Sequence, residues 1–126
     1  MRLFKDDMLG MTTYKDGDIE INISTPTRAM LECLALSPME FSLNEAYELM
    51  EGLATLRPIQ VQTLLENSLS IKAKRLFLYF AERAGHSWFK HIDQTSINLG
   101  AGNRSVAPGG ILIPKYKIVL PKELAE

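Results

Sequence analysis

The chain has 126 residues, a hydrophobic fraction of 46% and a charged fraction of 23%, which suits one domain with one core and excludes an intrinsically disordered chain. Its formal net charge of −1 excludes a strong overall attraction to nucleic acid or to a membrane. No apolar run approaches the ~20 residues of a membrane span, and a single cysteine allows no disulfide within the chain, so we expect a cytoplasmic protein.

The first predicted element is a β-hairpin over residues 11–24. Asp16-Gly17 supplies the left-handed backbone of a tight two-residue turn. After this turn, isoleucines at positions 19, 21 and 23 alternate with polar residues. This alternation predicts a hairpin with one buried face and one solvent-exposed face.

Helix signals follow the hairpin. Thr25-Pro26 reads as an N-cap followed by proline at the first helical position, and Arg57-Pro58 opens a further helix in the same way. Between them, Ser42 and Glu45 have the spacing of a capping box. Each start is followed by apolar residues at helical spacing, so we expect a central cluster of three to four helices.

The number of helices depends on residues 58–84, which contain no glycine or proline after Pro58. Ser70 is a candidate N-cap for a second helix, whereas the apolar stripe continues in phase across this position. One long helix and two shorter helices both remain open. In either case Gly85 is a good C-terminal stop.

Residues 92–126 change character. Three short apolar runs, at 97–99, 111–113 and 118–120, are separated by glycines and prolines, which indicates short strands between turns. The order of strands, helices and strands predicts an α+β fold with an N-terminal β-hairpin, a central helical cluster and short C-terminal strands. We expect one domain spanning residues 1–126.

Motifs for catalysis or metal binding are weak. His86 and His91 lack a third ligand, and we expect Trp88 and Phe89 between them to anchor the core. Gly100 and Gly102 lack the lysine–serine ending of a phosphate loop and read as a β-turn. We therefore predict no enzyme, no catalytic residue, no metal and no cofactor, and a core position for Cys33.

The most informative stretch is "SIKAKRLFLYFAERAGHSW", residues 70–88. Lys72, Lys74 and Arg75 lie in the first turns of a helix that would start at Ser70, where positive charge opposes the helix dipole by ~0.3–1 kcal/mol for each exposed cation. An external anion would compensate for this cost. A nearby acid such as Glu66, or one continuous helix, would explain the cations without a ligand.

The distribution of charge adds to this hypothesis. Residues 1–56 hold four basic and ten acidic residues, a net of −6, and residues 57–126 hold ten basic and five acidic residues, a net of +5. An antiparallel helix pair would place Arg57 near Arg83 and about 16 Å from Lys72, which makes two small basic groups. The predicted anion-binding residues are Arg57, Lys72, Lys74, Arg75 and Arg83.

Four stretches carry a family resemblance. "ISTPTRAMLECL", "EAYELMEGLATLRP", "QTLLENSLSIKAKRLFLYFAERAGHSWF" and "GGILIPKYKIVLP" are similar to the C-terminal domain of AbiEi-type antitoxins of bacterial type IV toxin–antitoxin, or abortive infection, systems. The similarity runs from about Ile23 to the C-terminus. It rests on the order and spacing of these stretches and not on a catalytic motif.

The resemblance implies a regulatory function. Members of this family typically bind their own promoter through an N-terminal winged helix, and their C-terminal domain counteracts a nucleotidyltransferase toxin without requiring a stable complex. About 24 residues precede the first predicted helix and read as β-structure, so we expect the winged helix to be absent. Contact with promoter DNA through this chain would then involve phosphates and depend strongly on salt.

Two other functions stay open. A protein-interaction module would bind the toxin directly through the acidic N-terminal half, with Glu45, Glu48 and Glu51 facing a basic surface. An enzyme acting on phosphate esters would need an acid that converges on Lys72 or Lys74.

Overall fold

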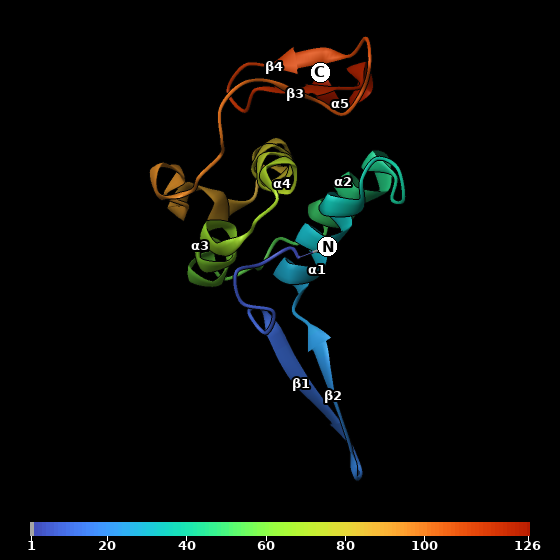
Figure 1. Ribbon diagram of the computed structural model, residues 1–126, viewed down its shortest axis with the longest axis vertical. Helices are drawn as coiled ribbons and strands as arrows, with labels where there is room; N and C mark the ends of the chain where they lie inside the picture. Colours follow the sequence, from blue (N-terminus) through green and yellow to red (C-terminus); the bar gives the residue numbers. More distant parts are fainter. Residues whose placement is uncertain (1) are drawn as a thin grey trace.

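The computed structural model describes residues 2–126 and has the predicted α+β composition. A hairpin is followed by four helices, two short 3-10 helices and a small mixed sheet that ends in one helical turn (Figure 1). The elements in chain order are β1 Met11–Asp16, β2 Ile19–Ser24, α1 Pro26–Leu36, α2 Leu43–Glu51, α3 Pro58–Asn67, α4 Ile71–Ala84, η1 Ser87–His91, η2 Gln94–Ser96, β3 Arg104–Ser105, β4 Ile111–Ile113, β5 Ile118–Leu120 and α5 Lys122–Ala125.

The helix boundaries follow the predicted caps. Thr25 accepts a hydrogen bond from the amide of Arg28, Ser42 accepts one from Glu45, and Gly85 ends α4 in the left-handed region at φ 74°. The Ser42 capping box makes this one bond, and no reciprocal bond from Glu45 is present among the described residues.

Residues 58–84 form two helices, which settles the alternative left open by the sequence. Ser68 is extended, and the hydroxyl of Ser70 accepts from the amide of Ala73 at 3.1 Å. The N-terminal segment pairs with this break, because the Leu69 amide donates to Leu3 O and the Lys5 amide donates to Asn67 O. The main-chain groups released by the break are therefore satisfied by residues far away in the sequence.

The core forms around α4, which packs against α1 and α2. Phe77 and Phe80 of α4 are fully buried, and Trp88 and Tyr47 pack against them with ring centroids 5.9 and 5.2 Å apart, respectively. Trp88 is buried and Phe89 is partly buried, as predicted, and Trp88 also donates to Leu53 O at 2.8 Å.

The small sheet lies on the opposite side of α4 from the hairpin (Figure 1). Its strand order is β3-β5-β4, with β3 parallel and β4 antiparallel to β5. We name β3, β4, β5 and α5 the C-terminal lobe. Of the three apolar runs predicted as strands, 111–113 and 118–120 are strands, whereas 97–99 is irregular and leads from η2 toward β3.

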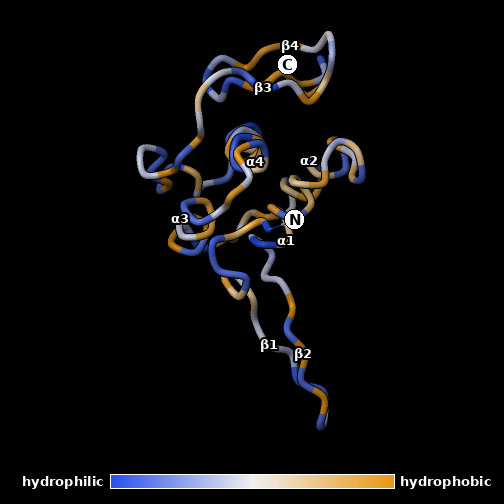
Figure 2. The backbone as a smooth tube through the Cα atoms, in the orientation of Figure 1, coloured by the Kyte–Doolittle hydropathy of each residue, from blue (hydrophilic) through white to orange (hydrophobic). Residues whose placement is uncertain are grey.

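The hairpin projects away from the helices (Figures 1 and 2). Its predicted buried face is exposed. Ile19, Ile21 and Ile23 are 66%, 48% and 41% exposed, and Tyr14 pairs with Ile21 on the same face. The alternating pattern correctly predicted the strands, but the two-residue turn is Gly17-Asp18, one residue later than the predicted Asp16-Gly17, because Asp16 belongs to β1 and pairs with Ile19. The prediction of a buried face was wrong because no other element of the described chain covers this hairpin.

Candidate anion-binding surface

Lys72 lies in the first turn of α4, but its ammonium group is bonded within the fold. Its Nζ donates to Ala35 O at 2.8 Å and also to Ser37 O, at the C-terminal end of α1. A cation at a helix C-terminus is favourable for the helix dipole and satisfies carbonyls that lack intrahelical partners. The unfavourable interaction of Lys72 with the dipole of α4 is therefore compensated by its favourable interaction with the C-terminal end of α1.

Lys74 and Arg75 are buried, with 3% and 1% of their surface exposed. Arg75 donates from Nε to Leu99 O at 2.8 Å and from Nη1 to Lys117 O at 2.9 Å. Within residues 2–126, Lys74 has neither a hydrogen bond nor an ion pair to its side chain. An external anion can reach such cations only where they face solvent, and the burial of Lys74 and Arg75 does not meet this condition.

The electrostatics of the three residues share one cause. Burial lowers the pKa of Lys72, Lys74 and Arg75, and neighbouring cations lower them further. Arg104 is the second cause for Lys72 and for Arg75, whereas Lys5 is the second cause for Lys74. Positive charge from Lys72, Arg75 and Arg104 thus accumulates between the start of α4 and β3, and main-chain carbonyls accept hydrogen bonds from Lys72 and Arg75 there.

Arg83 and Arg57 have different environments. Arg83 donates to the carbonyls of Leu124 at 2.8 Å and Glu126, near the C-terminus, and its guanidinium lies 5.4 Å from the ring centroid of Tyr47. Arg57 is exposed at the N-cap of α3 and makes no side-chain cap. Because α4 packs mainly against α1 and α2, the antiparallel α3–α4 pair expected from the sequence is not the main packing of the helical cluster.

A cavity of about 190 Å³ lies where α4 meets the C-terminal lobe. Three cationic side chains, Arg75, Lys115 and Lys117, line it together with Leu99, Gly100 and Tyr116. The amide of Arg104 donates to the same Lys117 carbonyl that accepts from Arg75, which places the start of β3 beside the cavity. We name Lys72, Arg75, Arg104, Lys115 and Lys117 the basic surface.

One carboxylate is bonded to this cluster among the described residues. Glu82 accepts from Lys115 and from the hydroxyl of Tyr116, each at 2.7 Å. Burial alone would raise the pKa of Glu82, but these two hydrogen bonds and the charge of Lys115 outweigh burial and lower it. Burial and the hydrogen bond to Glu82 both raise the pKa of Tyr116.

Arg104, Lys115 and Lys117 belong to this surface although the sequence did not predict them. The signal was present, because "GNR" and "PKYK" are basic segments flanked by turn residues. Each segment is short, however, and about forty residues of chain separate Lys115 from Arg75. The pairing of β3 with β5 brings the two segments together at the start of α4.

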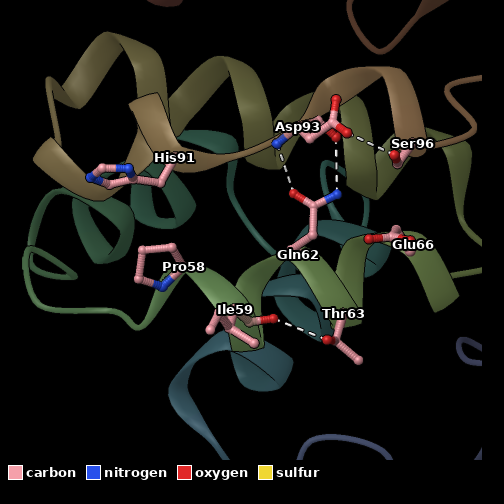
Figure 3. Close-up of a pocket in the computed structure, with 8 residues that line it drawn as sticks. All are labelled: Pro58, Ile59, Gln62, Thr63, Glu66, His91, Asp93 and Ser96. Carbon is pink, nitrogen blue, oxygen red and sulfur yellow. Dashed lines mark hydrogen bonds between the residues drawn. The ribbon is translucent and has the colours of Figure 1, made fainter.

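A larger groove of about 530 Å³ lies between α3 and the 3-10 helices (Figure 3). Its polar groups are largely bonded to one another: the Gln62 amide exchanges two hydrogen bonds with the main chain of Asp93, and the Asp93 carboxylate accepts from Thr95 and Ser96. Thr63 donates to Ile59 O within α3. The groove therefore offers few free polar groups for a ligand.

The remaining candidate residues lie apart. His86 is bonded through Nε2 to Met50 O and stacks on Trp88, whereas His91 is exposed beside the groove of Figure 3. No group of three metal-ligating side chains occurs in residues 2–126. Cys33 is partly buried, and burial, followed by the charge of Glu32, raises the pKa of its thiol.

Lys72 and Lys74 form no ion pair with a carboxylate in the described part of the chain. An enzyme of the kind considered above would need such a pair, so the geometry gives that function no support. No helix among the described residues has the length and apolar character needed to cross a membrane.

A basic surface on a small α+β domain is a feature of proteins that bind anionic partners. A family model described as "Transcriptional regulator, AbiEi antitoxin, Type IV TA system" matches residues 2–121. The chain belongs to this family. No curated protein and no solved structure gives a significant match.

Proposed function

We propose that this chain is the regulatory domain of a type IV toxin–antitoxin module in the cytoplasm, counteracts a cognate nucleotidyltransferase toxin, and contributes to autorepression through its basic surface. Family membership supports the regulatory role. Contact with nucleic acid is supported by one observation. Arg75, Lys115 and Lys117 line the same cavity, and among the described residues one carboxylate, that of Glu82, is bonded to one of them, Lys115. Surfaces of this kind attract phosphate and carry no information about base sequence.

Of the cations predicted from the sequence, Arg57 and Lys72 remain candidate phosphate contacts because neither is buried. Arg75 contributes from within the cavity. Anion binding by Lys74 and Arg83 stays a prediction. Lys74 is buried, and Arg83 donates hydrogen bonds to carbonyls near the C-terminus.

The salt dependence of DNA binding tests the proposal. A triple variant, Arg104→Gln with Lys115→Gln and Lys117→Gln, removes three cations of the basic surface. Its matched control, Lys15→Gln with Lys90→Gln and Lys122→Gln, removes three exposed cations that do not belong to the basic surface. Both are measured against a promoter fragment of the chain's own operon at several salt concentrations.

If each of the three surface residues neutralises one phosphate, the slope of log K against log salt becomes shallower by about 0.9 for each cation removed, and the control retains the wild-type slope. An equal slope in the triple variant and in the control would exclude the basic surface as the site of DNA contact.

A direct protein contact with the toxin is the second candidate, and the exposed hairpin favours it. One face presents Tyr14, Ile19 and Ile21 next to acidic residues at the turn, Asp16 and Asp18. An exposed apolar face flanked by charge is a feature of protein-binding surfaces. The three glutamates of α2 predicted for this role, Glu45, Glu48 and Glu51, are all exposed and form no ion pair among the described residues.

Co-purification with the toxin distinguishes the two candidates. Direct binding predicts a complex at moderate salt that is lost in the double variant Ile19→Thr with Ile21→Thr and is retained in the triple variant of the basic surface. Separation of the wild-type proteins at micromolar concentration would argue against direct binding.

A further inference from the structure

The guanidinium of Arg75 has an unused donor at the cavity between α4 and the C-terminal lobe. Only 1% of the residue's surface is exposed, and its Nε and Nη1 are both bonded to carbonyl oxygens. No described residue accepts a hydrogen bond from Nη2, although Arg75 lines the cavity. Arg28 Nε is the one fully buried side-chain nitrogen without a hydrogen-bond partner in the described part of the chain, so Nη2 of Arg75 faces the open side of the cavity and is free to donate to a ligand there.

The other cations beside this donor also lack acidic partners. Lys117, which lines the cavity with a backbone φ of 53°, and Arg104, which is exposed at the start of β3, form no ion pair among the described residues. Lys115 is paired with Glu82 at 2.7 Å. The cavity is therefore surrounded by more positive charge than the neighbouring carboxylate neutralises.

The size of the cavity limits what can enter it. Its volume of about 190 Å³ corresponds to roughly six water molecules at ~30 Å³ each, and it is below the ~300–1,000 Å³ of pockets that enclose a drug-sized ligand. A space of this size accommodates a single phosphate group. A phosphate within a nucleic-acid strand has chain on both sides, so a terminal phosphate enters such a cavity more easily.

We propose that this cavity binds a terminal phosphate group, with Arg75 and Lys117 as its donors and Arg104 beside its entrance. The rest of the ligand lies outside, over the basic surface. The inference rests on the proposed phosphate-binding role of that surface, but it names a different ligand, a phosphate monoester instead of an internal phosphodiester. Arg75 and Lys117 connect α4 to the C-terminal lobe, so occupation of the cavity also stabilises their junction.

The test is calorimetric titration of the full chain with inorganic phosphate, at constant ionic strength set by chloride. Saturable binding is expected, and Lys117→Gln should weaken it about tenfold or more, because a charged hydrogen-bond donor is removed while the Lys117 main-chain carbonyl that holds Arg75 remains. Lys90→Gln, an exposed cation of η1, is the control and should bind as the wild type does.

Arg75→Lys is a second variant, which keeps the charge but loses the planar set of donors, and it should also weaken binding. The melting curve of Arg75→Lys shows whether this variant is folded. If it is destabilised, the phosphate binding of Lys117→Gln decides the test. Absence of saturable phosphate binding by the wild type, or equal binding by Lys117→Gln, would overturn the inference.

Two further titrations identify the source of the phosphate. Tighter binding of a nucleoside monophosphate than of inorganic phosphate supports a small phosphorylated ligand, and a preference for a 5′-phosphorylated over a 5′-hydroxyl oligonucleotide supports a nucleic-acid end. Equal affinity for the two oligonucleotides, without phosphate binding, contradicts the inference. In that case the proposed function would still be supported if the triple variant made the slope of log K against log salt shallower.

Discussion

Lys72 illustrates how a locally unfavourable residue is compensated by a distant element. Its ammonium opposes the dipole of α4 but donates to two carbonyls at the end of α1. That the cations needed compensation was predictable from the sequence, and acids and external anions were the expected partners. The actual partners are main-chain carbonyls, which every residue carries and which no sequence pattern distinguishes.

Replacing Lys72 by Met tests this role. The Lys72→Met variant keeps an unbranched side chain but leaves the carbonyls of Ala35 and Ser37 without their charged donor. We expect the free energy of unfolding to fall by about 1–3 kcal/mol, measured by urea denaturation. Lys90→Met, at an exposed position, should change it by less than about 0.5 kcal/mol. Equal stability of the two variants would mean that the bonds of Lys72 contribute nothing.

Glu82 predicts a pH-dependent contribution to stability. Its pKa in the folded state lies below the usual 4.5, because hydrogen bonds from Lys115 and Tyr116 outweigh burial. A depressed carboxyl pKa means that the stabilisation is fully present above pH 4.5 and is lost as the pH falls through the folded-state pKa. Lys115 is largely exposed, so water screens this interaction and keeps the effect modest.

Glu82→Gln should therefore lower the melting temperature at pH 7, and the gap from the wild type should narrow as the pH falls below about 4.5. The control is Glu48→Gln, at an exposed position of α2 without an ion pair among the described residues. A gap that stays constant from about pH 7 to about pH 3 would show that Glu82 contributes through packing and not through its charge.

Among the elements, the hairpin separates what local sequence specifies from what it does not. The alternating isoleucines specified both strands, but not their register: the two-residue turn is Gly17-Asp18 and not the predicted Asp16-Gly17, because Asp16 pairs with Ile19. Burial of one face was inferred from the same alternation, but burial requires a second layer, and the position of the helices relative to the hairpin is not encoded in strand periodicity. The division of residues 58–84 was ambiguous for a similar reason, since the N-terminal segment that pairs with the break lies more than sixty residues away.

The exposed hairpin predicts an unusual tolerance to mutation. Ile21→Thr keeps a β-branched side chain and removes apolar surface that is already 48% exposed, so the melting temperature should change by no more than about 2 °C. Leu31→Ala, in the core of α1, should instead lose ~2–5 kcal/mol of stability. A large loss in Ile21→Thr would indicate that the apolar face is covered in solution.

Across the whole molecule, α4 connects elements from both ends of the chain. Its side chains reach the end of α1 through Lys72, the start of β5 through Arg75, and the C-terminal carbonyls through Tyr79 and Arg83. The helical caps, the fold class and the apolar face of α4 were predictable from the sequence. The hydrogen-bond partners of the polar side chains of α4 were not predictable, because each depends on which distant element of the chain packs against that side chain.

These connections lead to a prediction about cooperativity. The C-terminal lobe has few residues, but Ile118, Leu120 and Tyr116 are buried in the same core as α4. We therefore expect one calorimetric transition for residues 2–126, with the amides of β5 as strongly protected from hydrogen exchange as those of α4. Arg75→Met should shift this single transition to lower temperature, since it leaves two carbonyls without their donor. Two separate transitions, of which Arg75→Met moved one alone, would instead make the lobe an independent folding unit and restrict the stabilising role of Arg75 to it.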